Sequence, residues 1–423
     1  MRPLLFACLC AALFLSCNDK ANVVIPDTSS EQLLSGTKRI TPAMRPALEG
    51  VYRVLDGSDM FGGRVVLKWS YAVSENLLDT TFTLSVFTEK DMCYFAMEGG
   101  TLDSAFLFSG YWRKMVNTET GIARFGIAGS QGGRLLFQQN PAARKDSIVF
   151  VGAFGSGQGT PDRKLTFVYD HPLYSAKRFE MLAHRGGGRT SDMLPVSENT
   201  VEMILYTPRL GSTGIEIDVR LTKDGVPIMY HDNTVNPRLT QKSGLVGTIE
   251  EYTYAQLQAF VRLIHGEKIP TVQQVLDAAL YRTSIRVIYL DNKNSANLAL
   301  ERSIQKEYMA KAAAAKRDFT IYIGIPSEDK LNEFLALPDY ASAPSLNELT
   351  VDDTRKTQSL AWCPRWTQGT QMSDVAQMHA EGRRVYTWTM DIPSWVQQYM
   401  ASGDFDGMVT NYSPMVAFYH YSR

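Results

Sequence analysis

The chain has 423 residues, more than one typical domain, so two domains are the starting expectation. Its 44% hydrophobic and 21% charged residues are typical of an ordinary globular protein. The net charge of -1 gives no reason to expect a nucleic-acid partner, because binding to a phosphate backbone usually needs a basic surface.

The first residues have the features of a signal peptide. A short basic start precedes an apolar run over residues 4–15, which is too short to span a bilayer. The run ends Phe14-Leu15-Ser16-Cys17, which resembles a bacterial lipobox in which Cys17 is lipidated and becomes the mature N-terminus. We therefore expect a lipoprotein signal peptide over 1–16, with an ordinary secretory signal as the alternative. The polar residues 17–46 then form a tether, and the lipid anchors the protein in the bacterial cell envelope, facing the periplasm or the cell surface.

The cysteines do not predict a disulfide framework. Cys8 and Cys10 belong to the signal and Cys17 would carry lipid, which leaves Cys93 and Cys363. These two fall in different predicted domains, so a pairing between them is not supported, although the compartment would permit one.

Residues 47–175 have the pattern of an all-β accessory domain. Short runs rich in β-branched and aromatic residues, such as 81–87 and 148–151, are separated by glycine pairs. This spacing predicts an antiparallel barrel or a sandwich. The glycines of 155–159 are followed by Pro161 and no helical pattern, so a turn is a better interpretation than a phosphate-binding loop.

Residues 176–423 alternate strand patterns with helical patterns, which predicts parallel βαβ units. Eight such strands in about 240 residues match a TIM-like (β/α)₈ barrel, with a doubly wound sheet as the alternative. The predicted strands are 179–184, 213–219, 285–291, 318–324, 340–347, 359–364, 384–390 and 406–411. Helices are expected between several of them, at 271–280, 327–337, 372–381 and 395–401.

Charged residues interrupt the apolar runs near the ends of the predicted strands. Glu216 and Asp218 are two residues apart, as are Asp291 and Lys293, so each pair shares one face of its strand. Carboxylates side by side in a barrel interior repel each other unless a cation lies between them. Oxygen ligands of this kind suit one divalent cation, Ca²⁺ or Mg²⁺.

Two histidines lie close to these carboxylates in the predicted order of elements. His184 and Arg185 end the first strand, and His231 follows shortly after the second. Histidines exchange protons with a nucleophile and a leaving group, while cations stabilise charge on phosphate oxygens. The set therefore indicates phosphoryl chemistry.

The same residues occur in the order typical of a known family. From about residue 179 to residue 417 the chain resembles the glycerophosphodiester phosphodiesterases. The matching motifs are His184-Arg185-Gly186, Ser197-Glu198-Asn199-Thr200, Glu216-Ile217-Asp218-Val219, Thr222-Lys223-Asp224-Gly225, His231-Asp232, Lys268-Ile269-Pro270-Thr271, Leu290-Asp291-Asn292-Lys293, Trp388-Thr389 and Asp406-Gly407-Met408-Val409-Thr410.

The resemblance implies a role for each matching residue. His184 and His231 would be the general acid–base pair, and Arg185 and Lys293 would bind the substrate phosphate. Glu198 would support the site, and Trp388 would either line the cleft or pack the barrel. The metal ligands would be Glu216, Asp218 and Asp291.

Two positions depart from the family pattern. Asp291 stands where many relatives have glutamate, so the ion would lie closer to that strand or be reached through water. Asn411 stands where aspartate is common, at a position that the resemblance places outside the direct contacts of the site. We interpret the other histidines, His171, His265, His379 and His420, as structural.

The resemblance implies hydrolysis of a small-molecule glycerophosphodiester to glycerol 3-phosphate and an alcohol. One alternative is a phospholipase-D-like or cyclising activity on lysolipids. Another is a non-catalytic surface lipoprotein that binds a glycan or lipid. No pattern indicates a nucleotide or redox cofactor, and the head group and the oligomeric state stay open.

Overall fold

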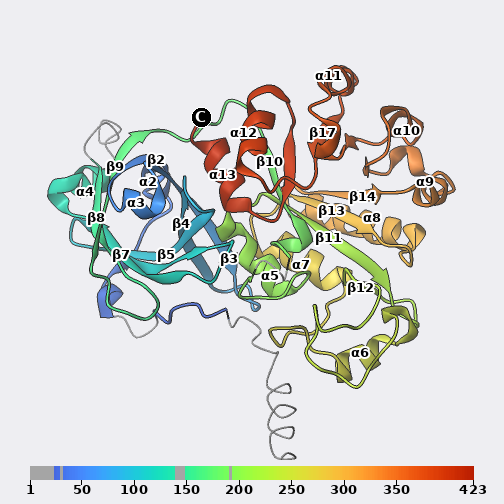
Figure 1. Ribbon diagram of the computed structural model, residues 1–423, viewed down its shortest axis with the longest axis horizontal. Coiled ribbons are helices and arrows are strands. Elements are labelled where there is room, and N and C mark those ends of the chain that lie inside the picture. The colour runs from blue at the N-terminus through green and yellow to red at the C-terminus, as the bar shows by residue number, and fades with distance from the viewer. Residues whose placement is uncertain (1–22, 29–31, 139–147, 190–192) are drawn as a thin grey trace, which may run out of the picture.

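The computed structural model describes residues 23–28, 32–138, 148–189 and 193–423 (Figure 1). The predicted signal peptide 1–16 and Cys17 lie outside the described residues, as do parts of the predicted tether. Within the described residues, no helix combines the length and the apolar character needed to cross a membrane.

The N-terminal part is a closed antiparallel barrel. Among the described residues its strands are ordered β5-β4-β3-β2-β9-β8-β7-β6, and β6 pairs with β5 to close the ring, so the structure is not a sandwich. The short β1 pairs with β5 outside the ring. The strands are β1 Lys38–Arg39, β2 Gly50–Asp56, β3 Arg64–Val73, β4 Thr80–Thr88, β5 Cys93–Leu102, β6 Ala105–Lys114, β7 Thr120–Ile127, β8 Val149–Phe154 and β9 Arg163–His171. Short helices join them: η1 Gln32–Leu34, α2 Arg45–Leu48, α3 Ser58–Phe61, η2 Gly129–Gln131 and α4 Gly133–Phe137.

Aromatic side chains fill the interior of this barrel. Alternate residues of each strand point inward, and those of β5 to β9 include Phe95, Trp112, Phe125, Phe150 and Phe167, all buried. The rings of Phe125 and Phe150 meet edge to face, with centroids 5.5 Å apart. These aromatic rings therefore form the core of the antiparallel barrel.

The C-terminal part is a closed parallel barrel. In the described chain its eight strands are ordered β10-β18-β17-β16-β15-β14-β13-β11, and β11 pairs with β10. This closure excludes the doubly wound alternative, whose sheet has two open edges. The strands are β10 Glu180–Ala183, β11 Gly214–Leu221, β13 Val287–Asn292, β14 Thr320–Ile325, β15 Ser345–Asn347, β16 Ala361–Trp362, β17 Arg384–Thr387 and β18 Gly407–Thr410, and β12 Pro227–Met229 pairs antiparallel with β11. Each of the eight parallel strands lies within or overlaps its predicted range, whereas β12 was not predicted.

Helices cover the outside of the parallel barrel (Figure 1). Thr271 begins α7 and Ser327 begins α9, where their hydroxyls accept the backbone N–H of the third helical residue. The helices are η4 His184–Gly186, α5 Val201–Tyr206, η6 Thr207–Leu210, η7 Ile249–Glu251, α6 Tyr254–Phe260, α7 Val272–Arg282, α8 Leu298–Ala314, α9 Glu328–Leu335, η8 Tyr340–Ser342, α10 Val351–Lys356, η9 Trp366–Gln368, α11 Met372–Ala380, α12 Pro393–Ser402 and α13 Ser413–Tyr421. Residues 232–267, with α6, form a lobe beside the barrel with its own small core.

The two barrels lie side by side and share one hydrophobic core (Figure 1). Phe87 and Tyr94 of the antiparallel barrel pack in the same buried cluster as residues of α5 and α13. Polar contacts cross the same boundary: Tyr206 OH lies 2.8 Å from Tyr111 OH and also contacts Tyr94 OH, and Ser85 Oγ donates to the Arg209 carbonyl (2.8 Å). We therefore expect the barrels to unfold together.

The substitution Tyr206→Phe tests this shared core. It removes one hydroxyl and leaves two buried tyrosine hydroxyls without that partner, which is expected to lower the free energy of unfolding by about 1–3 kcal/mol. Urea denaturation followed by fluorescence and by circular dichroism should give one coincident transition. Tyr281→Phe, at a side chain 39% exposed, is the control and should change stability by less than about 0.5 kcal/mol. Two separate transitions would contradict a shared core.

Candidate active site

A pocket of about 760 Å³ opens at the carboxyl ends of the parallel strands. Side chains from the loops after successive strands converge there, as in other (β/α)₈ barrels. Its polar and aromatic lining comprises His184, Arg185, Glu216, Arg220, His231, Asn233, Tyr289, Asp291, Asn292, Lys293, Asn294, Ser327, Glu348, Arg365, Gln368, Trp388 and Thr389.

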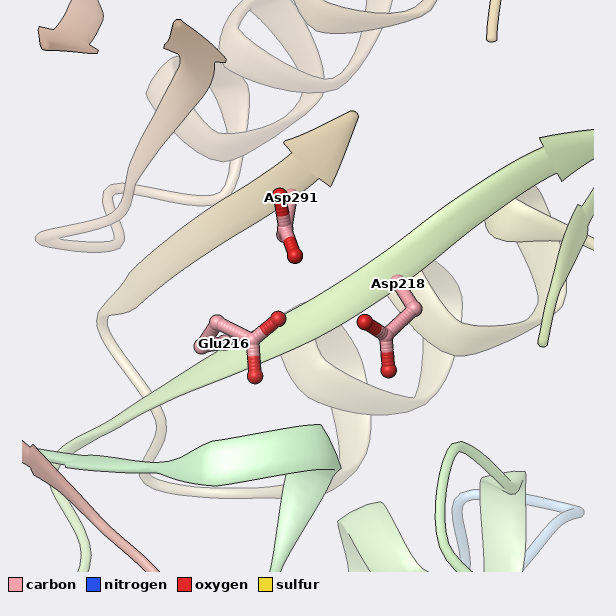
Figure 2. A group of neighbouring side chains, drawn as sticks. All are labelled: Glu216, Asp218 and Asp291. Atoms are coloured by element: carbon pink, nitrogen blue, oxygen red, sulfur yellow. The ribbon is translucent and has the colours of Figure 1, made fainter. Parts of the chain in front are cut away.

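Three carboxylates meet at one wall of the pocket. The pairing of β11 with β13 places Asp218 directly beside Asp291, and Glu216 lies two residues earlier on the same face of β11. Figure 2 shows the three side chains pointing toward one another, and each offers an oxygen within 4.8 Å of the others. Glu216 and Asp218 are fully buried. The strand period thus predicted their shared face correctly.

Charge in this cluster is only partly balanced. Burial and the carboxylates of Asp218 and Asp291 raise the pKa of Glu216 well above its usual range. Burial also opposes ionisation of Asp218, but Lys293, helped by His231 and Arg185, holds the pKa of Asp218 below its usual range. Lys293 Nζ lies 2.7 Å from Asp218 Oδ1 and also donates to Asp291. One ammonium therefore faces three acidic groups.

The cluster has the chemistry of a site for a divalent cation. Glu216 Oε1 is buried and has no hydrogen-bond partner among the described residues, which is costly unless a cation occupies the same space. Carboxylate oxygens at this spacing are the ligands that Mg²⁺ and Ca²⁺ prefer. Glu216, Asp218 and Asp291 can therefore hold such an ion.

Asn199 fixes the orientation of Asp218 from behind the pocket. Its Nδ2 donates to Asp218 Oδ2 (2.6 Å), and its Oδ1 accepts the backbone N–H of Asp218 (3.1 Å). Asn199 has φ +58°, a left-handed conformation that asparagine adopts more readily than most residues. The other oxygen of Asp218 is thus left for Lys293 and the pocket.

His184 is held by an amide. Its Nδ1 lies 2.8 Å from Asn411 Oδ1, while Asn411 Nδ2 donates to Asp391 Oδ2 (2.6 Å). Because the Asp391 carboxylate only accepts, the amide oxygen faces His184, and the proton of the imidazole lies on Nδ1. His184 Nε2 then points into the pocket, 3.8 Å from Glu216 Oε2. Burial, together with the charge of Arg185, lowers the pKa of His184.

His231 is held by a carboxylate and an arginine. Its Nδ1 donates to Asp232 Oδ1 (2.7 Å), and its Nε2 accepts from Arg185 Nη2 (2.9 Å). Arg185 itself has φ +53°, and its backbone N–H donates to Glu216 Oε2 (2.7 Å). Both histidines therefore face the carboxylate cluster with a defined tautomer.

Aromatic and acidic side chains of β13 and of the loops after β15 and β17 also line the pocket. Tyr289 OH donates to Glu348, and burial with the nearby Asp291 charge raises the pKa of Glu348 to about 8. Trp388 donates its Nε1–H to the Cys363 carbonyl (3.1 Å), and the Arg365 guanidinium lies 4.7 Å from the centre of its ring. Trp388 therefore lines the pocket, an outcome that the sequence left open.

The structure brings the predicted site residues of the C-terminal part together. His184, Arg185, Glu216, His231, Asp291, Lys293 and Trp388 line the pocket. Asp218 and Glu198 lie directly behind the lining, where they contact Lys293 and Arg185. Cys17 lies outside the described residues, and Cys93 and Cys363 are buried free thiols.

Several contacts that hold the site residues in place were not predicted from the sequence. Asn411 contacts His184 directly, because β18 pairs with β10 and brings the two strand ends side by side. Arg238 contacts Asp232 and Glu198, although it lies in a loop without a recognisable pattern. Tyr289 did have a signal, since it precedes Asp291 by two residues and so shares its face of β13.

Comparison with known proteins gives consistent matches. The chain is 32% identical over 165 residues to glycerophosphodiester phosphodiesterase 1 of Rattus norvegicus, covering 38% of this chain and 46% of that protein. It is 28% identical over 248 residues to a probable glycerophosphodiester phosphodiesterase 2 of Mycobacterium tuberculosis, covering 54% of this chain and 86% of that one. A solved glycerophosphodiester phosphodiesterase from Parabacteroides distasonis has 22% identity and a TM-score of 0.44, covering 56% of this chain and 94% of that structure.

The chain thus spans about half the length of the mammalian relative. The family model for glycerophosphoryl diester phosphodiesterases matches residues 184–414, which is more than half of the chain and includes both histidines and the carboxylate cluster. The chain belongs to the glycerophosphoryl diester phosphodiesterase family.

Proposed function

We propose that the C-terminal barrel hydrolyses glycerophosphodiesters to glycerol 3-phosphate and an alcohol, with His184 and His231 as the acid–base pair and one divalent cation. The observation that carries the proposal is the pair of histidines facing three clustered carboxylates in one pocket. Family membership supports the same class of reaction.

The two histidines divide the proton transfers between them. One accepts the proton of the attacking oxygen, and the other gives a proton to the alcohol oxygen as the phosphorus–oxygen bond breaks. Asn411 and Asp232 occupy the Nδ1 positions, so proton transfer falls to the Nε2 atoms, of which that of His231 also contacts Arg185 Nη2. One histidine thus begins as a neutral base and the other as an imidazolium acid, and the pair holds the same number of protons after the reaction as before.

Arg185 and Lys293 bind and orient the phosphate. Arg185 Nε is buried without a hydrogen-bond partner among the described residues, while its Nη1 and Nη2 contact Glu198 and His231. Burial alone would lower the pKa of Lys293, but Asp218 and Asp291 raise it, which keeps the ammonium charged. The cation, when bound by Glu216, Asp218 and Asp291, supplies further stabilisation of charge developing on the phosphate.

The polar lining of the pocket favours a deacylated, water-soluble diester. The same pocket is lined by the hydrogen-bonding groups of Tyr289, Ser327, Glu348 and Gln368. A lysolipid would require its acyl chain to leave the pocket along this polar wall, with unfavourable desolvation of those groups.

Enzyme assays test the proposed hydrolysis. Protein from residue 18 onward should release glycerol 3-phosphate from at least one of glycerophosphocholine, glycerophosphoethanolamine, glycerophosphoglycerol and glycerophosphoinositol. The activity should need added Mg²⁺ or Ca²⁺ and vanish with chelator. His184→Ala and His231→Ala should each lower kcat by about 100-fold or more, because a proton transfer is lost.

His379→Ala is the matched control, because that histidine pairs with Asp406 away from the pocket. A folded, metal-loaded protein that hydrolyses none of these diesters would contradict the proposal. Turnover of a lysolipid alone would instead support the alternative activity.

Thermal unfolding with added cation tests the metal site. At a cation concentration about 100 times Kd, binding should stabilise the wild-type protein by about 2.7 kcal/mol. Asp218→Asn removes a buried anionic ligand and should abolish most of this gain in thermal unfolding and calorimetric titration. Asp352→Asn, at a side chain 87% exposed, should bind the ion as wild type does. Equal stabilisation of all three proteins would contradict the site.

We also propose the cellular placement and the domain limits that the sequence indicates. Residues 1–16 would be a signal peptide, 17–46 a tether, 47–175 an accessory domain and 176–423 the enzyme domain. Lipidation of Cys17 would hold the enzyme on the bacterial envelope, facing the periplasm or the cell surface. Expressed in a bacterium, the full chain should fractionate with membranes, and Cys17→Ser should not be labelled by a fatty-acid probe. Wild-type protein without label would refute the anchor.

A further inference from the structure

Five side chains, His231 among them, form a closed ring of hydrogen bonds. His231 Nδ1 donates to Asp232 (2.7 Å), and Asp232 Oδ2 accepts from Arg238 Nε (2.9 Å). Arg238 Nη1 and Nη2 each lie 3.3 Å from an oxygen of Glu198. Glu198 Oε1 accepts from Arg185 Nη1 (3.0 Å), and Arg185 Nη2 returns to His231 Nε2 (2.9 Å).

In this ring each of the two acids lies between two basic groups, and Arg185 and His231 are adjacent, in a partly desolvated space. Glu198 is 2% exposed and lies between two guanidinium groups. Burial opposes ionisation of Asp232, but Arg238, His231 and Asn236 lower its pKa. Charge-assisted bonds of this kind are stronger than neutral ones and fix the geometry of both partners.

Arg238 is the member that links the two acids. It donates to Asp232, which orients His231, and to Glu198, which orients Arg185. His231 and Arg185 are among the residues that line the pocket in the described chain, and Arg238 is not. It lies in the lobe of residues 232–267, where Asn236 Oδ1 accepts its backbone N–H (3.0 Å).

We propose that Arg238 is a positioning residue that orients the acid–base residue His231 and the phosphate-binding residue Arg185 together. The inference rests on the proposed function for its kinetic consequences. The orientation of His231 can be tested without any activity. Asp232 accepts a hydrogen bond from Nδ1, so the neutral imidazole of His231 carries its proton on that nitrogen.

The shape of the guanidinium is required as well as its charge. Arg238 reaches Asp232 with Nε and Nη2 and Glu198 with Nη1 and Nη2, so one planar group serves two carboxylates. A lysine presents a compact charge and no such fork. Arg238→Lys should therefore restore little of what Arg238→Gln loses.

Steady-state kinetics on the diester that the wild-type protein hydrolyses provide the first test. Arg238→Gln should lower kcat by about 10- to 100-fold, as expected when a supporting partner of a site residue is lost, and raise KM severalfold because Arg185 is no longer held. Arg262→Gln is the matched control: this arginine of the same lobe donates to the carbonyls of Gln258 and Val261 and should leave both constants unchanged.

A second readout separates this inference from the proposed function. Long-range ¹H–¹⁵N spectra of the imidazole rings at pH 8 report which nitrogen of each histidine is protonated. His231, identified among the six histidines with His231→Gln, should be the Nδ1–H tautomer in the wild-type protein. It should become a mixture of tautomers in Arg238→Gln, because Asp232 loses the two Arg238 donors that hold it against His231 Nδ1. It should stay Nδ1–H in Arg262→Gln. This result would support the ring even if no diester were hydrolysed.

The double variant Glu198→Gln/Arg238→Gln tests whether the ring acts as a unit. Its loss of kcat/KM should be close to that of the more impaired single variant, because either change breaks the same ring. An unchanged His231 tautomer and a kcat within twofold of wild type in Arg238→Gln would overturn the proposal. If Arg238→Gln does not fold, Arg238→Lys is read by the same two measurements.

Discussion

The mutual repulsion of Glu216, Asp218 and Asp291 is the constraint around which the C-terminal barrel is organised. Closure of the barrel pairs β11 with β13 and fixes these carboxylates within 4.8 Å of one another in a buried wall. Such an arrangement is unfavourable unless positive charge and hydrogen-bond donors surround it. Lys293 and Asn199 supply part of that requirement, and Glu216 Oε1 is left for a cation.

The two histidines line the same pocket as this cluster and are held by different hydrogen-bond partners. A neutral amide, Asn411, holds His184, whereas a carboxylate within the ring of Arg238 and Glu198 holds His231. An amide oxygen accepts a hydrogen bond from Nδ1–H, but it is neutral and stabilises a protonated imidazole less than a carboxylate does. Both imidazoles are therefore oriented through Nδ1, but only His231 has a carboxylate that would stabilise its protonated form. This difference suits the opposite proton-transfer roles proposed for the two histidines.

The antiparallel barrel contributes to the rigidity of this site. Tyr94 and Tyr111 contact Tyr206 at the end of α5, and the next residue, Thr207, donates to the carbonyl of Gly186 in the His184-Arg185-Gly186 turn. Arg113, fully buried, donates to the carbonyl of Met193 in the same loop region. The segment that carries His184 and Arg185 is thus packed from behind by the other barrel, a reason for the two to share one core.

The sequence by itself determined the parallel barrel, its eight strand positions and the shared face of Glu216 and Asp218. These features follow from apolar residues that recur every two positions in strands and every 3.6 in helices, a pattern visible within short segments. Ordered motifs likewise indicated His184, His231, Arg185 and Lys293. Tertiary structure alone decided three features. The N-terminal strands close into a barrel, Asn411 reaches His184 across 227 positions, and Arg238 joins Asp232 to Glu198. These contacts depend on strand closure and loop conformation, which bring distant residues together without leaving any periodic trace in the sequence.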